Sequence, residues 1–304
     1  MQNELVYTIT GEAERGQVAS YHRKPDALFL NKTKHKIDIA GLKPKQQKNA
    51  LLVINNEYRS KFTIGFEIEK NSLSRNAVKE YELFCGFERD GSCGFEAVTH
   101  ILPLLPSGKW RNKVYDIIHK AERIIDDRYS PSDRRCGGHV TIACEGLTGA
   151  ELNLAVRNYS GIILALFRKR LKNTYCGANR RFMPASGMCQ YNSLSSYAYD
   201  SNGWHYKYQT ALVKGNCLEF RVVSKFESVK QVMRRYELFH ELVDYSVNET
   251  KGTWKGFVKR IEPIIRSMYN GDADKTSEII YLAKHFQEFI NKGTIHDDIA
   301  EYLD

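Results

Sequence analysis

The chain has 304 residues, of which 42% are apolar, 27% charged and 12% aromatic, with a formal net charge of +9. This composition is typical of a globular protein with a sizeable core. No apolar run reaches the roughly 20 residues that a spanning helix needs, so we expect no membrane partner. The basic charge suits nucleic acid or nucleotide phosphates as partners and does not distinguish between them.

The compartment is indicated by the N-terminus and the cysteines. The first residues show no basic head followed by an apolar stretch, so we expect no secretory signal. Seven cysteines occur and none forms a CxxC pair, which favours reduced thiols and a cytoplasmic protein. Cys136-Gly-Gly-His139 is half of a zinc motif, but no second half stands at a suitable spacing.

The composition of residues 1–60 predicts a basic N-terminal extension, because this stretch is rich in Lys and is broken by Pro and Gly. Two interpretations remain open for it. In the first, the stretch is a solvated extension. In the second, short strands at 27–30 and 50–54 form a hairpin arm that contacts a partner or nucleic acid.

The pattern becomes regular after Lys61. Residues 62–69 alternate strictly between apolar and polar, with Glu67 and Glu69 on the polar face, which predicts a half-buried strand. Further elements follow in chain order: a strand over 91–100, a helix over 110–127 and a strand over 137–144.

Thr148 and Glu151 form a predicted capping box, which begins a long helix that continues to Phe167. An aromatic-rich loop over 175–206 follows. Three roles remain open for this loop: its aromatic residues pack locally, it forms a lid over substrate, or it stacks on nucleic-acid bases. The later elements are a strand over 216–223 and helices over 228–247, 254–268 and 277–290. Strands separated by helices predict an α+β fold with helices on one face of the sheet.

Polar residues gather on one alternating face of the predicted strands. Glu67 and Glu69 share a side, His139 shares a side with Thr141, and Glu219 shares a side with Arg221; Glu96 lies on the second strand. Two interpretations remain open. The face is solvated, as in many antiparallel sheets, or it holds a cation, for which Mg²⁺ together with substrate phosphates is the natural choice.

Five motifs in order resemble those of the amidoligase family, which belongs to the glutamate–cysteine ligase and glutamine synthetase superfamily. The chain has a GxExE strand at Gly65–Glu69, a DGS segment at Asp90–Ser92 that leads into GFEAVT at Gly94–Thr99, and CGGHV at Cys136–Val140. A basic run ending in Tyr-Cys occupies Arg168–Cys176, and the strand Leu218–Arg221 reads LEFR. The resemblance covers residues 62–247.

The resemblance implies a curved antiparallel sheet of the glutamine synthetase type, with ATP and Mg²⁺ on its concave face and helices packed on its convex face. It implies a catalytic domain over 61–250, followed by a C-terminal helical segment over 251–304 packed on that domain. The implied reaction joins a small-molecule or peptide carboxylate to an amine through an acyl phosphate.

The resemblance also implies roles for individual residues. The implied metal ligands are Glu67, Glu69, Glu96, Glu219 and His139. The implied catalytic residues are Arg221, Glu219 and His139. The implied nucleotide-binding residues are Glu67, Glu69, Arg168 and Arg170.

The chain departs from the family pattern in two places. Thr141 stands where the family usually has a second His, and Lys225 stands where small residues are common. These departures leave an alternative open, namely a catalytically inactive relative that acts as an interaction or nucleic-acid-binding module. Nucleic acid is the less favoured partner. The identity of the acid and the amine, and the oligomeric state, are not determined by the sequence.

Overall fold

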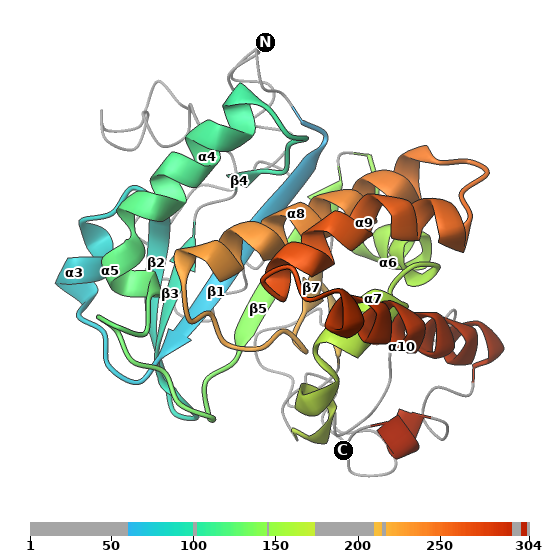
Figure 1. Cartoon of the computed structure of the whole chain (residues 1–304). Helices are drawn as coiled ribbons and strands as arrows, with labels where there is room; N and C mark the ends of the chain where they lie inside the picture. The colour runs from blue at the N-terminus through green and yellow to red at the C-terminus, as the bar shows by residue number, and fades with distance from the viewer. Residues whose placement is uncertain are drawn as a thin grey trace.

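A computed structural model describes residues 60–99, 102–144, 146–173, 210–214, 217–293 and 299–302 (Figure 1). Predictions made for residues 1–59 and for the aromatic-rich loop over 175–206 lie outside these residues.

Within the described residues, seven strands form one open sheet in the order β2-β3-β1-β5-β7-β6, with β4 paired to β1, and every pairing is antiparallel. Helices and strands are mixed along the chain, so the predicted α+β class with an antiparallel sheet is confirmed. The strands are β1 (Phe62–Lys70), β2 (Phe84–Asp90), β3 (Gly94–Thr99), β4 (Leu102–Pro103), β5 (Gly138–Cys144), β6 (Ala211–Lys214) and β7 (Cys217–Phe220).

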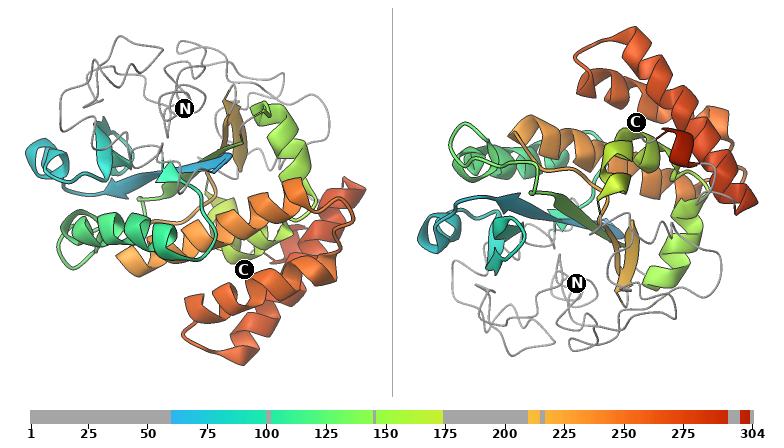
Figure 2. Two further views of the ribbon diagram at one scale, coloured as in Figure 1. Left: turned by 90° about the horizontal axis from the view of Figure 1, so that it is seen from above. Right: turned by 90° about the horizontal axis from the view of Figure 1, so that it is seen from below.

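Helices cover one face of this sheet. Figure 2 shows α4 (Lys109–Lys120) and α8 (Val229–Asn248) on the same side of β1. The apolar side chains of β1 point to that side, where Phe66 meets Phe226 edge to face at 5.6 Å between ring centroids. α9 (Trp254–Met268) packs on α8, and α10 (Ala273–Lys292) packs on α7 (Gly161–Leu166). The remaining helical elements are α3 (Arg75–Lys79), α5 (Glu122–Ile125), α6 (Gly149–Arg157), η5 (Arg168–Lys172) and η6 (Ile299–Tyr302).

The prediction that β1 is half-buried is wrong, because all nine of its residues are buried. β1 lies in the middle of the sheet between β3 and β5. Its polar side chains, Glu67 and Glu69, pack against polar side chains of those neighbours and are only 4% and 7% exposed. The interpretation of a solvated acidic face is therefore wrong as well.

The predicted capping box is confirmed: the Glu151 amide donates to Thr148 Oγ1, and the Thr148 amide donates to the Glu151 carboxylate. The single long helix predicted after it is wrong, because the chain bends between α6 and α7. A Cβ on Gly161 would lie 2.3 Å from the carbonyl oxygen of Ala283 in α10. Because Gly161 has no side chain, the start of α7 lies closer to the α10 backbone than another residue would allow.

The helix predicted over 110–127 is likewise interrupted, at Ala121, between α4 and α5. α9 has the predicted bounds, and α8 agrees with the helix predicted over 228–247 to within one residue, with Ser228 as its N-cap. In the described part of the chain, no helix combines the length and the apolar character needed to cross a membrane.

Candidate functional site

The second face of the sheet, opposite α4 and α8, carries buried carboxylates from three strands. Glu67 and Glu69 come from β1, Glu96 from β3 and Glu219 from β7, and each is 7% exposed or less. We call this group, together with His139 of β5, the acidic cluster. Buried carboxylates of like charge repel one another, so their convergence requires protons, cationic partners or a bound metal.

Strand register explains why these residues meet. Residues directly opposite each other in neighbouring antiparallel strands project to the same face. Glu69 lies opposite Glu96, and Glu67 lies opposite His139. Glu219 lies opposite Thr141, two residues from His139 on the same strand face.

His139 lies at the centre of the acidic cluster. Its Nδ1 hydrogen-bonds to Glu67 Oε2 and lies 3.7 Å from Glu219 Oε1. Its Nε2 lies 3.7 Å from Glu69 Oε1. The imidazole thus faces one carboxylate pair on one side and the Glu69 carboxylate on the other.

The cluster offers two groups of atoms spaced for metal ligation, and His139 belongs to both. Within each group the ligand atoms all lie within 4.8 Å of one another. The first group is Glu67, His139 and Glu219, and the second is Glu69, Glu96 and His139. Four carboxylates and one imidazole form an oxygen-rich donor set, which suits Mg²⁺ and contains no thiolate that would favour a softer metal.

Two arginines approach the cluster. Arg221 Nη1 donates to Glu219 Oε1 at 2.5 Å. The guanidinium of Arg170 lies over Gly137, where a Cβ would be 2.4 Å from Arg170 Nη2 and 3.5 Å from Glu69 Oε2. The Gly137 amide itself donates to Glu69 Oε2 at 2.5 Å. Glycine at 137 therefore leaves room for the guanidinium of Arg170 next to the amide that binds Glu69.

The structure does not bring Arg168 to the acidic cluster. Its guanidinium donates to Ala165 O and forms an ion pair with Glu278 of α10 at 3.2 Å. Arg168 and Arg170 belong to the 3₁₀ helix η5, in which residues two apart point in different directions because three residues complete a turn. Of the two predicted nucleotide-binding arginines, only Arg170 lies beside the carboxylates.

Protonation within the cluster is shifted by burial and charge. Burial, followed by the charge of Glu67 and a hydrogen bond with it, raises the pKa of Glu96 well above its ordinary value. Burial, followed by the charge of Arg221, lowers the pKa of His139. At neutral pH the imidazole is therefore uncharged and can act as a ligand.

The metal-free protein is expected to lose stability as the pH rises from the acid range, because of Glu96. Its carboxyl ionises near its ordinary pKa of 4.5 in the unfolded chain but keeps its proton to higher pH in the folded protein. Between these two pKa values the folded state binds more protons, so the free energy of unfolding falls as the pH rises. We expect Glu96→Gln to flatten this fall in urea unfolding measured from about pH 4 to about pH 8. Glu122→Gln, at an exposed ion pair, serves as the control; equal slopes in both variants would contradict this origin.

The two departures from the family pattern lie in different surroundings. Thr141 is buried on the acidic face, and its hydroxyl makes no hydrogen bond within the described part of the chain. It therefore offers an additional polar atom beside Glu219. Lys225 lies away from the cluster and bonds to the side chain of Asp127 and the carbonyl of Ser132.

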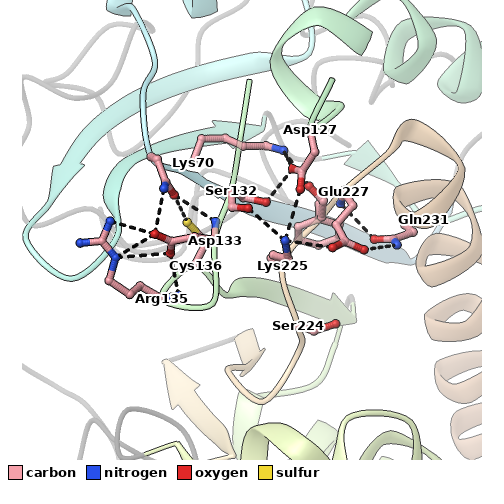
Figure 3. A network of polar contacts seen from close by, with 12 residues as sticks. Lys70, Asp127, Ser132, Asp133, Arg135, Cys136, Ser224, Lys225, Glu227 and Gln231 are labelled. Atoms are coloured by element: carbon pink, nitrogen blue, oxygen red, sulfur yellow. Dashed lines mark hydrogen bonds and ion pairs between the residues drawn. The ribbon is translucent and has the colours of Figure 1, made fainter. Parts of the chain in front are cut away.

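A second polar network supports the end of β1 that carries Glu69 (Figure 3). Lys70 points to the helical face, where its ammonium donates to Asp127 Oδ1 at 2.6 Å and to Phe226 O at 2.9 Å. Asn71 bonds to Asp133 and to the thiol of Cys136. These bonds hold the segment that leads into Gly137 and β5 against the end of β1.

The half zinc motif does not form a metal group. The groups with metal-ligand spacing in the described ranges contain His139 and carboxylates, without Cys136. Cys136 and Cys93 are buried free thiols. A hydrogen bond from Cys93 lowers the pKa of Cys136.

Sequence reasoning missed two contributors to the site. Glu88 of β2 lies opposite Glu96 and extends the acidic row, but the strand that carries it has a register shift between Phe84 and Gly86 and was not predicted. Gly137 contributes an amide to Glu69, and its signal was the Gly-Gly pair that precedes the predicted strand. β4 and β6 were also not predicted.

A scan of the chain against models of known protein families found no match, and a search of curated proteins found none either.

Proposed function

We propose that the protein is an ATP- and Mg²⁺-dependent ligase that forms an amide bond between a carboxylate and an amine through an acyl phosphate. One observation carries the proposal: four buried carboxylates from three strands and one imidazole from a fourth converge on one sheet face beside two arginines. A buried cluster of this kind is costly unless a cation compensates it.

Two divalent ions fit the cluster better than one, because the two ligand groups share only His139. Glu67 and Glu219 would hold one ion, and Glu69 and Glu96 the other. Bound Mg²⁺ neutralises phosphate oxygens and orients them for in-line transfer. Ionisation of Glu96 would accompany binding, because a metal ligand must be deprotonated.

The chain's own cations supply the remaining charge. Arg221 keeps its Nε buried without a hydrogen bond in the described part of the chain, so it retains a donor for a transferring phosphoryl group. Arg170 lies beside Glu69 and can contact a phosphate held there. In the proposed reaction the substrate carboxylate takes the γ-phosphoryl group and ADP leaves. The amine then displaces inorganic phosphate and loses a proton.

The glutamine synthetase type of sheet is part of the same proposal. The acidic cluster and the helices lie on opposite faces of an open antiparallel sheet, which is the arrangement that this type requires. We infer that the acidic face is the concave face on which ATP binds.

Mg-ATP is expected to raise the unfolding temperature of the protein, because a ligand that binds only the folded state stabilises it by mass action. ATP with EDTA is expected to give no such rise. The catalytic test is ADP release, screened over pairs of carboxylates and amines, with amide formation confirmed by mass spectrometry.

An inactive relative would give a different pattern. It would show no ADP release with any pair, and a nucleic-acid-binding module would bind DNA or RNA with affinity that falls steeply with salt. Absence of any stabilisation by Mg-ATP would refute the ligase proposal.

A further inference from the structure

A cavity of about 340 Å³ lies on the helical side of the sheet, away from the acidic cluster. Residues from the first turns of α8, the end of α7, the end of α9 and the segment after β7 line it. Small-ligand sites begin at roughly this size.

The charges that line the cavity are all positive. Lys230, Arg234 and Arg235 face it, and no carboxylate is among its described lining residues. The acids nearby are already engaged: Glu237 pairs with Arg234, and Glu227 pairs with Lys225 at 2.9 Å. Arg234 thus has a carboxylate partner, whereas Lys230 and Arg235 bond to neutral acceptors in the described residues, which leaves the cavity with positive charge beside apolar walls.

Arg235 shows that this charge lacks full compensation. The residue is only 4% exposed, and it donates to Ser224 O at 2.5 Å, Ser224 Oγ at 2.9 Å and Lys225 O at 3.0 Å. These acceptors are neutral, and its Nε is buried without a partner within the described residues. Burial lowers the pKa of Arg235 to about 9, opposed by the charge of Glu227.

The guanidinium of Arg235 is also held in place by aromatic rings. It lies 4.4 Å from the ring centroid of Phe226 and 5.3 Å from that of Phe167. A buried cation that is fixed in position and bonded only to neutral groups is destabilising unless an anion approaches it. Its orientation is thus prepared for a ligand that brings negative charge.

We propose that this cavity binds the phosphate group of a small phosphorylated molecule, with Arg235, Arg234 and Lys230 as its cationic partners. Two guanidiniums and an ammonium match a dianion better than the single charge of a carboxylate, because guanidiniums present several donors to phosphate oxygens. The hydroxyl of Ser228 and the amide of Gln231 also line the cavity. Its apolar side, which includes Met268, would contact the rest of the ligand.

The test is a calorimetric titration of the protein with inorganic phosphate, at constant ionic strength and without ATP or divalent metal. The wild-type protein is expected to bind phosphate saturably. The double variant Lys230→Gln/Arg234→Gln is expected to bind about tenfold more weakly or worse, since a tenfold change corresponds to loss of about one charge-assisted contact. Arg235→Met is avoided because it also removes bonds that hold the segment after β7.

Two controls separate this cavity from other phosphate sites. Lys259→Gln removes an exposed cation of α9 that does not line the cavity, and it is expected to leave the affinity unchanged. Leaving out ATP and divalent metal is the second control, because the titration then does not depend on the proposed ligase site, and failure of the ligase proposal would not imitate failure of this one. Absence of saturable binding by the wild type, or equal affinity in the double variant and Lys259→Gln, would overturn the proposal.

Discussion

Glu67→Gln is expected to reduce ATP-dependent amide formation by about 10²–10³-fold, the usual cost of losing one electrostatic group in an active site. The Glu67 carboxylate accepts a hydrogen bond from His139 Nδ1 and belongs to the ligand group that includes Glu219. Gln keeps the shape and a polar contact to His139 but removes the negative charge. The measurements are ADP release and Mg²⁺ binding by calorimetry.

The metal-free Glu67→Gln protein is expected to be folded, because the substitution relieves repulsion with Glu96, whose pKa the Glu67 charge helps to raise. Its unfolding temperature in EDTA should equal or exceed that of the wild type, while stabilisation by Mg-ATP is lost. Glu122→Gln, in an exposed pair with Arg128, is the matched control and should keep both ATP-dependent amide formation and stabilisation by Mg-ATP. Wild-type rates in Glu67→Gln would contradict the assignment.

Asp127→Ala is expected to lower the free energy of unfolding by about 3 kcal/mol, because it leaves a buried ammonium without its counter-ion. The side chain of Lys70 is 0% exposed, and Asp127 is its carboxylate partner at 2.6 Å (Figure 3). Phe226 O would remain as an acceptor for Lys70, but a neutral carbonyl compensates a charge poorly. Urea unfolding at neutral pH measures the change.

A double variant separates the lost pair from other damage at this position. Lys70→Met/Asp127→Ala replaces the ammonium by an apolar side chain of similar length and is expected to recover most of the stability lost in Asp127→Ala. The second single variant is Lys70→Met. If the losses of unfolding free energy in Lys70→Met and Asp127→Ala simply add up in the double variant, with no recovery, the ion pair contributes little to stability.

The acid response of the same pair gives an independent check. Burial opposes ionisation of Asp127, but hydrogen bonds from Lys70 and Ser132 outweigh it, so its pKa is lowered in the folded protein. The resulting stability is present above the unfolded pKa and is lost as the pH falls through the folded pKa. Asp127→Ala should lack this part of the acid destabilisation.

The sequence predicted the local elements well where one physical signal dominated. Strict alternation predicted β1, and the reciprocal bonds of Thr148 and Glu151 were predicted from their spacing alone. Both are short-range properties, because a capping box or a strand face is decided within a few residues. The breaks at Ala121 and at 158–160 were missed. The second break brings Gly161 against α10, a contact with residues more than 100 positions away in the chain.

By itself the sequence determined which residues share a strand face, because side chains alternate along a strand with a period of two. It placed Glu67 with Glu69 and Glu219 with Arg221 in this way. Only the tertiary structure decided which faces meet, that the acidic face is buried, and which arginine of η5 reaches it. The reason is that strand order and register join residues distant in the chain, such as Glu67 and His139, through pairings that no local pattern encodes.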